Sequence, residues 1–117
     1  MNTQELGVKG EKFAARYLKK NKYKLFYRNF RTGFGEVDII AEKGDIIAFV
    51  EVKTRTAGQM LNPSASVDQK KQARILSAAN SYMSIYKVKK QPRFDIAEVV
   101  VDQNGKFSIN YIENVFA

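Results

Sequence analysis

Apolar residues recur at helical spacing in two parts of the chain. The first stripe, from Thr3 to about Asn21, predicts an amphipathic helix. The second follows Ser66-Val67-Asp68-Gln69, which has the form of a capping box that opens a helix. Glu11 borders the first stripe, and Lys71 borders the second. The two stripes consist of Leu6, Phe13, Ala14, Tyr17 and Leu18, and of Ile75, Ala78, Ala79, Tyr82, Met83 and Tyr86.

Shorter apolar runs, rich in β-branched and aromatic residues, predict strands. They cover residues 23–31, 36–42, 45–53, 93–101 and 106–112, with glycine-containing turns at 32–35, 43–44 and 104–105. Residues 54–66 have no period and contain Gly58 and Pro63, which predicts a mobile loop. The order α-β-β-β-α-β-β predicts an α/β fold in which helices flank a mixed β-sheet. The length of 117 residues predicts one domain over residues 1–117.

Charged side chains interrupt two strands that are otherwise apolar. Asp38 stands in Gly35-Glu36-Val37-Asp38-Ile39-Ile40, and Glu51 opens Glu51-Val52-Lys53. Ionised groups in core strands are costly unless they are paired or hold a metal. Because alternate residues face the same side of a strand, Glu36 lies with Asp38, and Glu51 lies with Lys53. The hairpin can therefore gather carboxylates and one ammonium at one spot. Such oxygens suit a hard cation such as Mg²⁺ or Mn²⁺.

The absence of cysteine and histidine narrows the chemistry that the chain can support. It excludes a disulfide scaffold, a thiolate or imidazole zinc site and a histidine general base. Hydrolysis would have to use carboxylates, lysine and a metal ion. No apolar run is long enough to span a membrane, and residues 1–5 lack the apolar region of a signal peptide. We therefore expect a cytoplasmic protein with no membrane partner.

The net charge of +8 suits a polyanionic partner. A basic surface that only keeps the protein soluble is the simpler alternative. Basic residues flank the acidic positions, however, which favours nucleic acid. A membrane surface fits less well, because neither predicted helix carries a bulky aromatic face opposite its lysines and arginines.

Several short motifs occur in a fixed order along the chain. They are Gly10-Glu11, Arg28-Asn29 with Arg31, Gly35-Glu36-Val37-Asp38, Phe49-Val50-Glu51-Val52-Lys53-Thr54-Arg55, Lys71, and Arg93-Phe94-Asp95. An aspartate followed by Glu-x-Lys on the next strand resembles the PD-(D/E)XK nuclease superfamily. The whole set is similar to the YraN family, which itself resembles archaeal Holliday-junction resolvases. The resemblance covers nearly the whole chain and implies a restriction-endonuclease-like fold.

The resemblance also implies a metal site. Asp38 and Glu51 would bind one or two Mg²⁺ or Mn²⁺ ions, helped by the Val52 carbonyl and by Glu11. Glu36 would be a secondary ligand or a structural cap. Each acid also has a simpler interpretation. Asp38 could bond to a turn, Glu51 could form an ion pair that needs no metal, and Glu11 could be a solvated helix residue.

Basic residues complete the predicted site. Lys53, beside Glu51 on one strand face, would position the attacking water or the phosphate. Arg31, Arg55 and Lys71 would contact phosphates of the nucleic acid, although each of them could equally be ordinary surface charge.

Two functions are consistent with these residues. The first is a metal-dependent nuclease that cleaves DNA, with branched or flapped substrates implied by the resolvase-like relatives. A branched substrate would favour a homodimer, because two cuts could then be placed symmetrically. The alternative is a nucleic-acid-binding module without turnover, or a subunit of a DNA-processing assembly. Metal binding would distinguish the two, since an inactive module need not hold a divalent cation.

Overall fold

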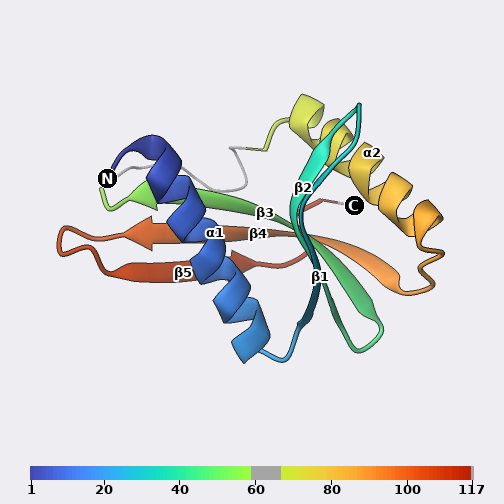
Figure 1. The fold of residues 1–117 in the computed structure, drawn as a ribbon, viewed down its shortest axis with the longest axis horizontal. Helices are drawn as coiled ribbons and strands as arrows, with labels where there is room; N and C mark the ends of the chain where they lie inside the picture. Colours follow the sequence, from blue (N-terminus) through green and yellow to red (C-terminus); the bar gives the residue numbers. More distant parts are fainter. Residues whose placement is uncertain (59–66, 117) are drawn as a thin grey trace.

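The computed structural model describes residues 1–58 and 67–116 and confirms the predicted order of elements (Figure 1). The helices and strands are α1 (Thr3–Lys20), β1 (Lys24–Arg31), β2 (Glu36–Lys43), β3 (Ile46–Thr56), α2 (Gln69–Ile85), β4 (Gln91–Val101) and β5 (Phe107–Ile112). The predicted α/β fold, a mixed sheet flanked by helices, is confirmed. Neither of these helices within the described ranges is long and apolar enough to cross a membrane.

The strands form one sheet in the order β1-β2-β3-β4-β5. Strands β1, β2 and β3 form an antiparallel meander, β4 lies parallel to β3, and β5 returns antiparallel to β4. A parallel neighbour requires a crossover connection, which α2 supplies between β3 and β4. Strand β3 is therefore central, and its residues 47–51 are buried.

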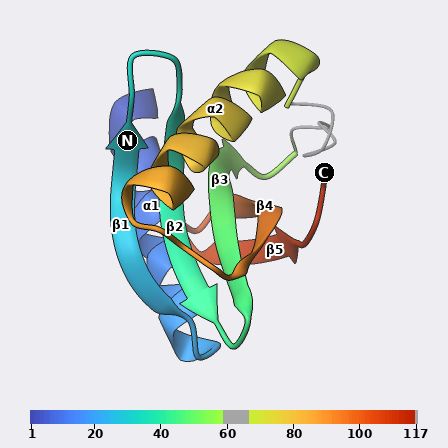
Figure 2. The same ribbon diagram turned by 90° about the vertical axis from the view of Figure 1, so that its right-hand side faces the viewer.

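The two helices cover opposite faces of this twisted sheet (Figures 1 and 2). Alternation along β2 and β3 supplies both faces, since Ile39 and Val50 lie in the α1 core while Ile40 and Phe49 lie in the α2 core. The helices contribute the apolar positions that their stripes predicted, namely Ala14, Ala15 and Leu18 from α1, and Ile75, Ala78, Ala79 and Tyr82 from α2. Both faces of the central strands are thus excluded from water.

The start of α2 differs from the predicted capping box. The N-cap is Asp68, whose Oδ1 accepts a hydrogen bond from the Lys71 backbone N–H at 2.8 Å. The predicted cap, Ser66, lies outside the described residues. An aspartate is as good an N-cap as serine, so Asp68 can cap α2 although the capping-box pattern points to Ser66.

Strand β3 extends beyond its predicted end at Lys53. Thr54, Arg55 and Thr56 continue the parallel ladder, opposite residues 99–101 of β4. The predicted loop therefore starts too early, because these polar residues gave no apolar period while a run of three valines on β4 provides their partners. Ala57 and Gly58 follow as a turn, and the rest of the predicted loop, residues 59–66, lies outside the described residues.

Candidate active site

Asp38 lies where strands β2 and β3 stop pairing. Their ladder ends at Ile39 opposite Val50, whereas β3 continues to Thr56 against β4. The Asp38 side chain replaces the missing strand partner, because its Oδ2 accepts a hydrogen bond from the Val52 backbone N–H at 2.8 Å. The Asp38 side chain thus forms a hydrogen bond with the neighbouring strand β3 and not with a turn. It connects β2 to β3 at the point where their backbone pairing ends.

Glu51 follows Val50 on β3 and is only 6% exposed. Two ammonium groups neutralise it. Lys53 Nζ lies 3.5 Å from Glu51 Oε2, and Lys71, in the first turn of α2, forms an ion pair with the same oxygen. The predicted alternation, which placed Glu51 and Lys53 on one side of the strand, is consistent with this contact. Paired in this way, a buried carboxylate avoids much of its desolvation cost.

The environment of Asp38 favours its neutral form. Burial is the main cause, the negative charge of Glu51 is the next, and together with a side-chain hydrogen bond to Glu51 they raise the pKa of Asp38 from 3.8 to about 8. The Val52 N–H opposes this shift, since it stabilises the carboxylate, and the charge of Glu11 adds to it. Asp38 and Glu51 therefore form a crowded pair of carboxyl groups at the end of the β2–β3 ladder.

The two lysines at Glu51 respond differently to their surroundings. Burial and then the nearby Lys71 lower the pKa of Lys53. Burial also acts to lower the pKa of Lys71, but its contacts with Glu51 outweigh burial and raise that pKa overall. Lys71 is accordingly the firmly charged partner of Glu51.

Glu11 reaches the same region from α1. It borders a hollow of about 530 Å³ that Asp38 and Val52 also line. Its carboxylate is held by β1, because Arg28 Nη2 lies 3.1 Å and Asn29 Nδ2 lies 3.0 Å from Glu11 Oε1. Glu11 is thus engaged by protein groups and is not a freely solvated helix residue.

The other predicted site residues lie around this centre. Glu36 forms an ion pair with Arg31 at 3.0 Å and borders a second hollow, on the α2 side, with Glu51 and Lys71. Arg31 also lines the hollow that contains Asp38. Arg55 is buried and paired with Glu98 of β4, a position that suits packing of the sheet better than contact with a phosphate.

A divalent cation would find hard oxygen ligands at Asp38 and Glu51. Across residues 1–58 and 67–116, no three acidic, histidine or cysteine side chains converge closely enough to hold an ion as they stand. The donor chemistry nevertheless fits such an ion, because a cation relieves the repulsion between two crowded carboxyl groups. Since Mg²⁺ keeps several water ligands in proteins, two carboxylates can suffice. The roles of the Val52 carbonyl, Glu11 and Glu36 as further ligands stay predictions.

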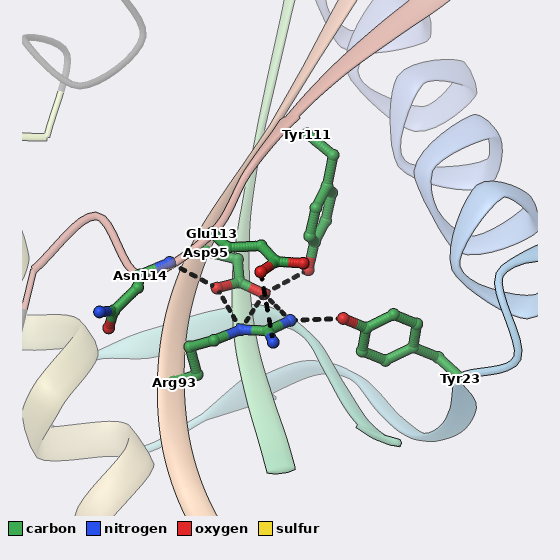
Figure 3. A network of polar contacts seen from close by, with 6 residues as sticks. All are labelled: Tyr23, Arg93, Asp95, Tyr111, Glu113 and Asn114. Atoms are coloured by element: carbon green, nitrogen blue, oxygen red, sulfur yellow. Dashed lines mark hydrogen bonds and ion pairs between the residues drawn. The ribbon is translucent and has the colours of Figure 1, made fainter. Parts of the chain in front are cut away.

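A second buried network is centred on Arg93 and Asp95 of β4 (Figure 3). Asp95 is 1% exposed and accepts hydrogen bonds from Arg93 at 2.8 Å, from Tyr111 Oη at 2.6 Å and from the Asn114 backbone N–H at 3.0 Å. Arg93 also donates to the Tyr23 hydroxyl. The network thus connects Tyr23, which lies between α1 and β1, to β4, to β5 and to the C-terminal segment.

Two residues in this network, Arg93 and Tyr111, have shifted pKa values, and Asp95 contributes to both shifts. Hydrogen bonds to Asp95 raise the pKa of Arg93 above its ordinary value, and burial, followed by the charge of Asp95, raises the pKa of Tyr111. The available signal in the sequence was the motif Arg93-Phe94-Asp95, which places an opposite-charge pair on one face of an apolar strand. Because Asp95 has several protein donors, its arrangement indicates a structural role.

The chain matches a described protein family over most of its length. The model of a family described as Uncharacterised protein family UPF0102 matches residues 10–99, a span that includes Glu11, Asp38, Glu51 and Asp95. A UPF0102 protein of Dictyoglomus thermophilum is 42% identical over 118 residues, covering 99% of this chain and 100% of that protein. One of Caldicellulosiruptor saccharolyticus is 42% identical with the same coverage, and one of Alkaliphilus metalliredigens is 43% identical over 115 residues, covering 97% and 99%. The chain therefore belongs to the UPF0102 family, the YraN family that its motifs resemble.

Proposed function

We propose that this protein is a nuclease that hydrolyses phosphodiester bonds of DNA with the help of Mg²⁺ or Mn²⁺. The observation that carries the proposal is the pair of crowded carboxyl groups, Asp38 and Glu51, with Lys53 beside Glu51. An acid with a raised pKa next to a second acid and a lysine is typical of sites that perform chemistry.

The chain's own groups would divide the work. Asp38 and Glu51 supply the oxygens that hold the cation, and the Val52 N–H fixes the orientation of Asp38. Lys53, whose side chain is 29% exposed, positions the attacking water or a phosphate oxygen. When bound, the metal lowers the pKa of a water ligand and stabilises negative charge on the scissile phosphate.

The substrate class follows from charge and from the resolvase-like resemblance. A net charge of +8 suits contacts to a phosphate backbone, which carry little sequence preference and weaken as salt rises. Branched or flapped DNA is the substrate that the resemblance favours. A two-fold homodimer would then place two such sites symmetrically on a four-way junction.

A cleavage panel tests the proposal directly. Linear duplex, single strand, flap and four-way junction would each be incubated with Mg²⁺, with Mn²⁺ and with chelator. We expect cleavage of at least one structure with metal and none with chelator, and we expect Asp38→Asn to abolish it. If the purified protein cuts none of these substrates with either metal, the nuclease proposal is wrong.

A binding module without turnover is the second candidate, and one observation favours it. The acids are already satisfied by protein groups, since Lys53 and Lys71 neutralise Glu51 while Arg28 and Asn29 hold Glu11. Titration with Mn²⁺ separates the two candidates. The nuclease requires a site that Asp38→Asn removes, whereas the binding module requires DNA binding that is the same with metal and with chelator.

A further inference from the structure

A stripe of basic residues runs along the solvent side of α1. Lys9, Lys12, Arg16 and Lys20 follow one another at helical spacing, so they share one face of the helix. All four are exposed. None of them forms an ion pair or a side-chain hydrogen bond with any other part of the chain that the structure describes. The stripe therefore presents uncompensated positive charge.

This arrangement contrasts with the basic residues at the candidate site. There, Arg28, Arg31 and Lys71 are each paired with an acid. The local sequence is consistent with this charge, because no aspartate or glutamate occurs between Lys12 and Lys20, although Glu5 lies one turn before Lys9. The basic stripe keeps its charge available for an external anion.

Aromatic rings lie at the base of the same surface. A groove of about 190 Å³ between α1 and β5 is lined by Lys9, Lys12, Arg16, Phe13 and Phe107. The rings of Phe13 and Phe107 are partly buried, with centroids 5.7 Å apart and planes inclined at 34°. A neighbouring hollow, which shares Phe13 and Arg16, extends the groove to Lys20. A row of cations beside aromatic rings is the combination that binds single-stranded nucleic acid.

The groove is linked to the candidate site by a chain of hollows around α1. The hollow that contains Asp38 shares Gln4 and Val8 with a hollow over the first half of the helix. That second hollow shares Lys9 and Lys12 with the groove between α1 and β5. A strand that lies along the stripe can thus follow the protein surface toward Asp38.

We propose that the groove between α1 and β5 binds a single-stranded nucleic acid and leads it toward the Asp38 site. The four cations of the stripe contact successive phosphates, and Phe13 and Phe107 stack against unpaired bases. A duplex fits less well, because its bases are already stacked within the helix and cannot reach the rings. The direction of the strand toward a cleavage site rests on the proposed function, whereas binding in the groove does not.

Binding of a fluorescent oligothymidylate, measured in chelator over a range of salt, tests the groove without any cleavage. The test variant is Lys12→Gln with Arg16→Gln. The matched control is Lys87→Gln with Lys89→Gln, which removes the same charge from two exposed residues after α2. Each phosphate contact on a single strand contributes about −0.7 to the slope of log affinity against log salt. We expect the test variant to make that slope shallower by about 1.4 and the control to leave it unchanged.

A second variant separates stacking from charge. Phe13→Leu with Phe107→Leu, checked for folding by thermal melting, should weaken oligothymidylate binding while it leaves the salt slope unchanged. The proposal is overturned if the groove and control variants lose affinity equally, or if wild-type protein does not bind the oligonucleotide. It is also overturned if the loss of Lys12 and Arg16 weakens binding of duplex DNA, or of anionic phosphatidylserine vesicles, more than it weakens binding of oligothymidylate. Because no metal is present, failure here is distinct from failure of the nuclease test.

Discussion

Gly10 of α1 lies against Thr54 of β3 so closely that a side chain would not fit between them. A Cβ built at residue 10 would stand 1.9 Å from Thr54 Oγ1 and 2.8 Å from Thr54 Cβ. This contact sets the distance between the first helix and the central strand, and it holds the next residue, Glu11, at the hollow that contains Asp38.

Gly10→Ala should therefore destabilise the protein, although alanine is the better helix former. The methyl group must displace Thr54, and overpacking of this kind costs about 1–3 kcal/mol. Urea unfolding measures the loss. Gly7→Ala is the matched control, because a Cβ at residue 7 meets no atom within 4 Å and should stabilise α1 by about 0.5–1 kcal/mol. Equal effects of the two substitutions would contradict a tight contact at residue 10.

Much of this site could be predicted from the period of its strands. Alternation alone placed Glu51 beside Lys53, and the apolar runs on either side showed that Asp38 lay near the core. The sequence does not show which glycine of α1 packs against the sheet. Gly7 and Gly10 are both poor helix formers in α1, yet of the two only Gly10 has a close neighbour in the structure. Which glycine faces the sheet depends on the tilt of the helix, and local sequence does not encode that tilt.

Long-range pairing explains what the sequence did not reveal. The end of the β2–β3 ladder before Asp38 depends on how two strands diverge, and the continuation of β3 to Thr56 depends on residues of β4. The ion pair between Lys71 and Glu51 likewise joins two elements, β3 and α2, that are separated by residues 57–68. The partners of Asp95 come from several segments, including Tyr23 through Arg93. These contacts join residues that are far apart in the chain. The period of apolar residues predicts the helices and strands, but it does not predict which of them become neighbours.

Asp38 should make the stability of the metal-free protein depend on pH. Its pKa of about 8 in the folded protein lies above the ordinary 3.8, so the folded state binds the proton more tightly than the unfolded chain. The resulting stabilisation of the folded state is complete below the unfolded-state pKa of 3.8. It is lost as pH rises through the folded-state pKa of about 8. Asp38→Asn has no proton to lose and keeps an oxygen for the Val52 N–H.

The measurement is a comparison of wild type and Asp38→Asn by urea unfolding in chelator at pH values of about 5 and about 9, on either side of the raised pKa. The variant should gain stability relative to wild type on going to the higher pH. The relative gain should exceed about 1.4 kcal/mol, the free energy of a single pKa unit. A difference in unfolding free energy that stays constant between the two pH values would show that Asp38 ionises normally.

Asp95→Asn should be among the more damaging substitutions on β4. It removes the charge that Arg93 faces and replaces an acceptor with a donor opposite Tyr111, and removal of one partner from a buried ion pair costs about 3–5 kcal/mol. Glu113→Gln is the control. Glu113 lies 3.7 Å from Arg93 but its side chain is 60% exposed, so its loss should cost at most about 1 kcal/mol. Thermal or urea unfolding of both variants decides whether Asp95 is the centre of the network.

The chemistry of the site gives the last prediction. Asp38→Asn and Glu51→Gln should each abolish metal-dependent cleavage and leave oligonucleotide binding in chelator largely intact, because an amide lacks the negative charge that holds Mg²⁺. Lys53→Ala should slow cleavage and spare Mn²⁺ binding, since an ammonium is not a ligand. Lys90→Ala is its control, a partly exposed lysine that pairs with Glu42 at 2.8 Å, away from the candidate site.

Turnover and Mn²⁺ affinity must be measured separately for these variants, because their combination assigns the roles. Loss of both in the acid variants, with loss of turnover alone in Lys53→Ala, is the expected pattern. If Asp38→Asn cleaved DNA at the wild-type rate, Asp38 would not be required for catalysis. If Lys53→Ala weakened Mn²⁺ binding as much as the acid substitutions do, Lys53 would act by holding Glu51 in place and not by positioning water or phosphate.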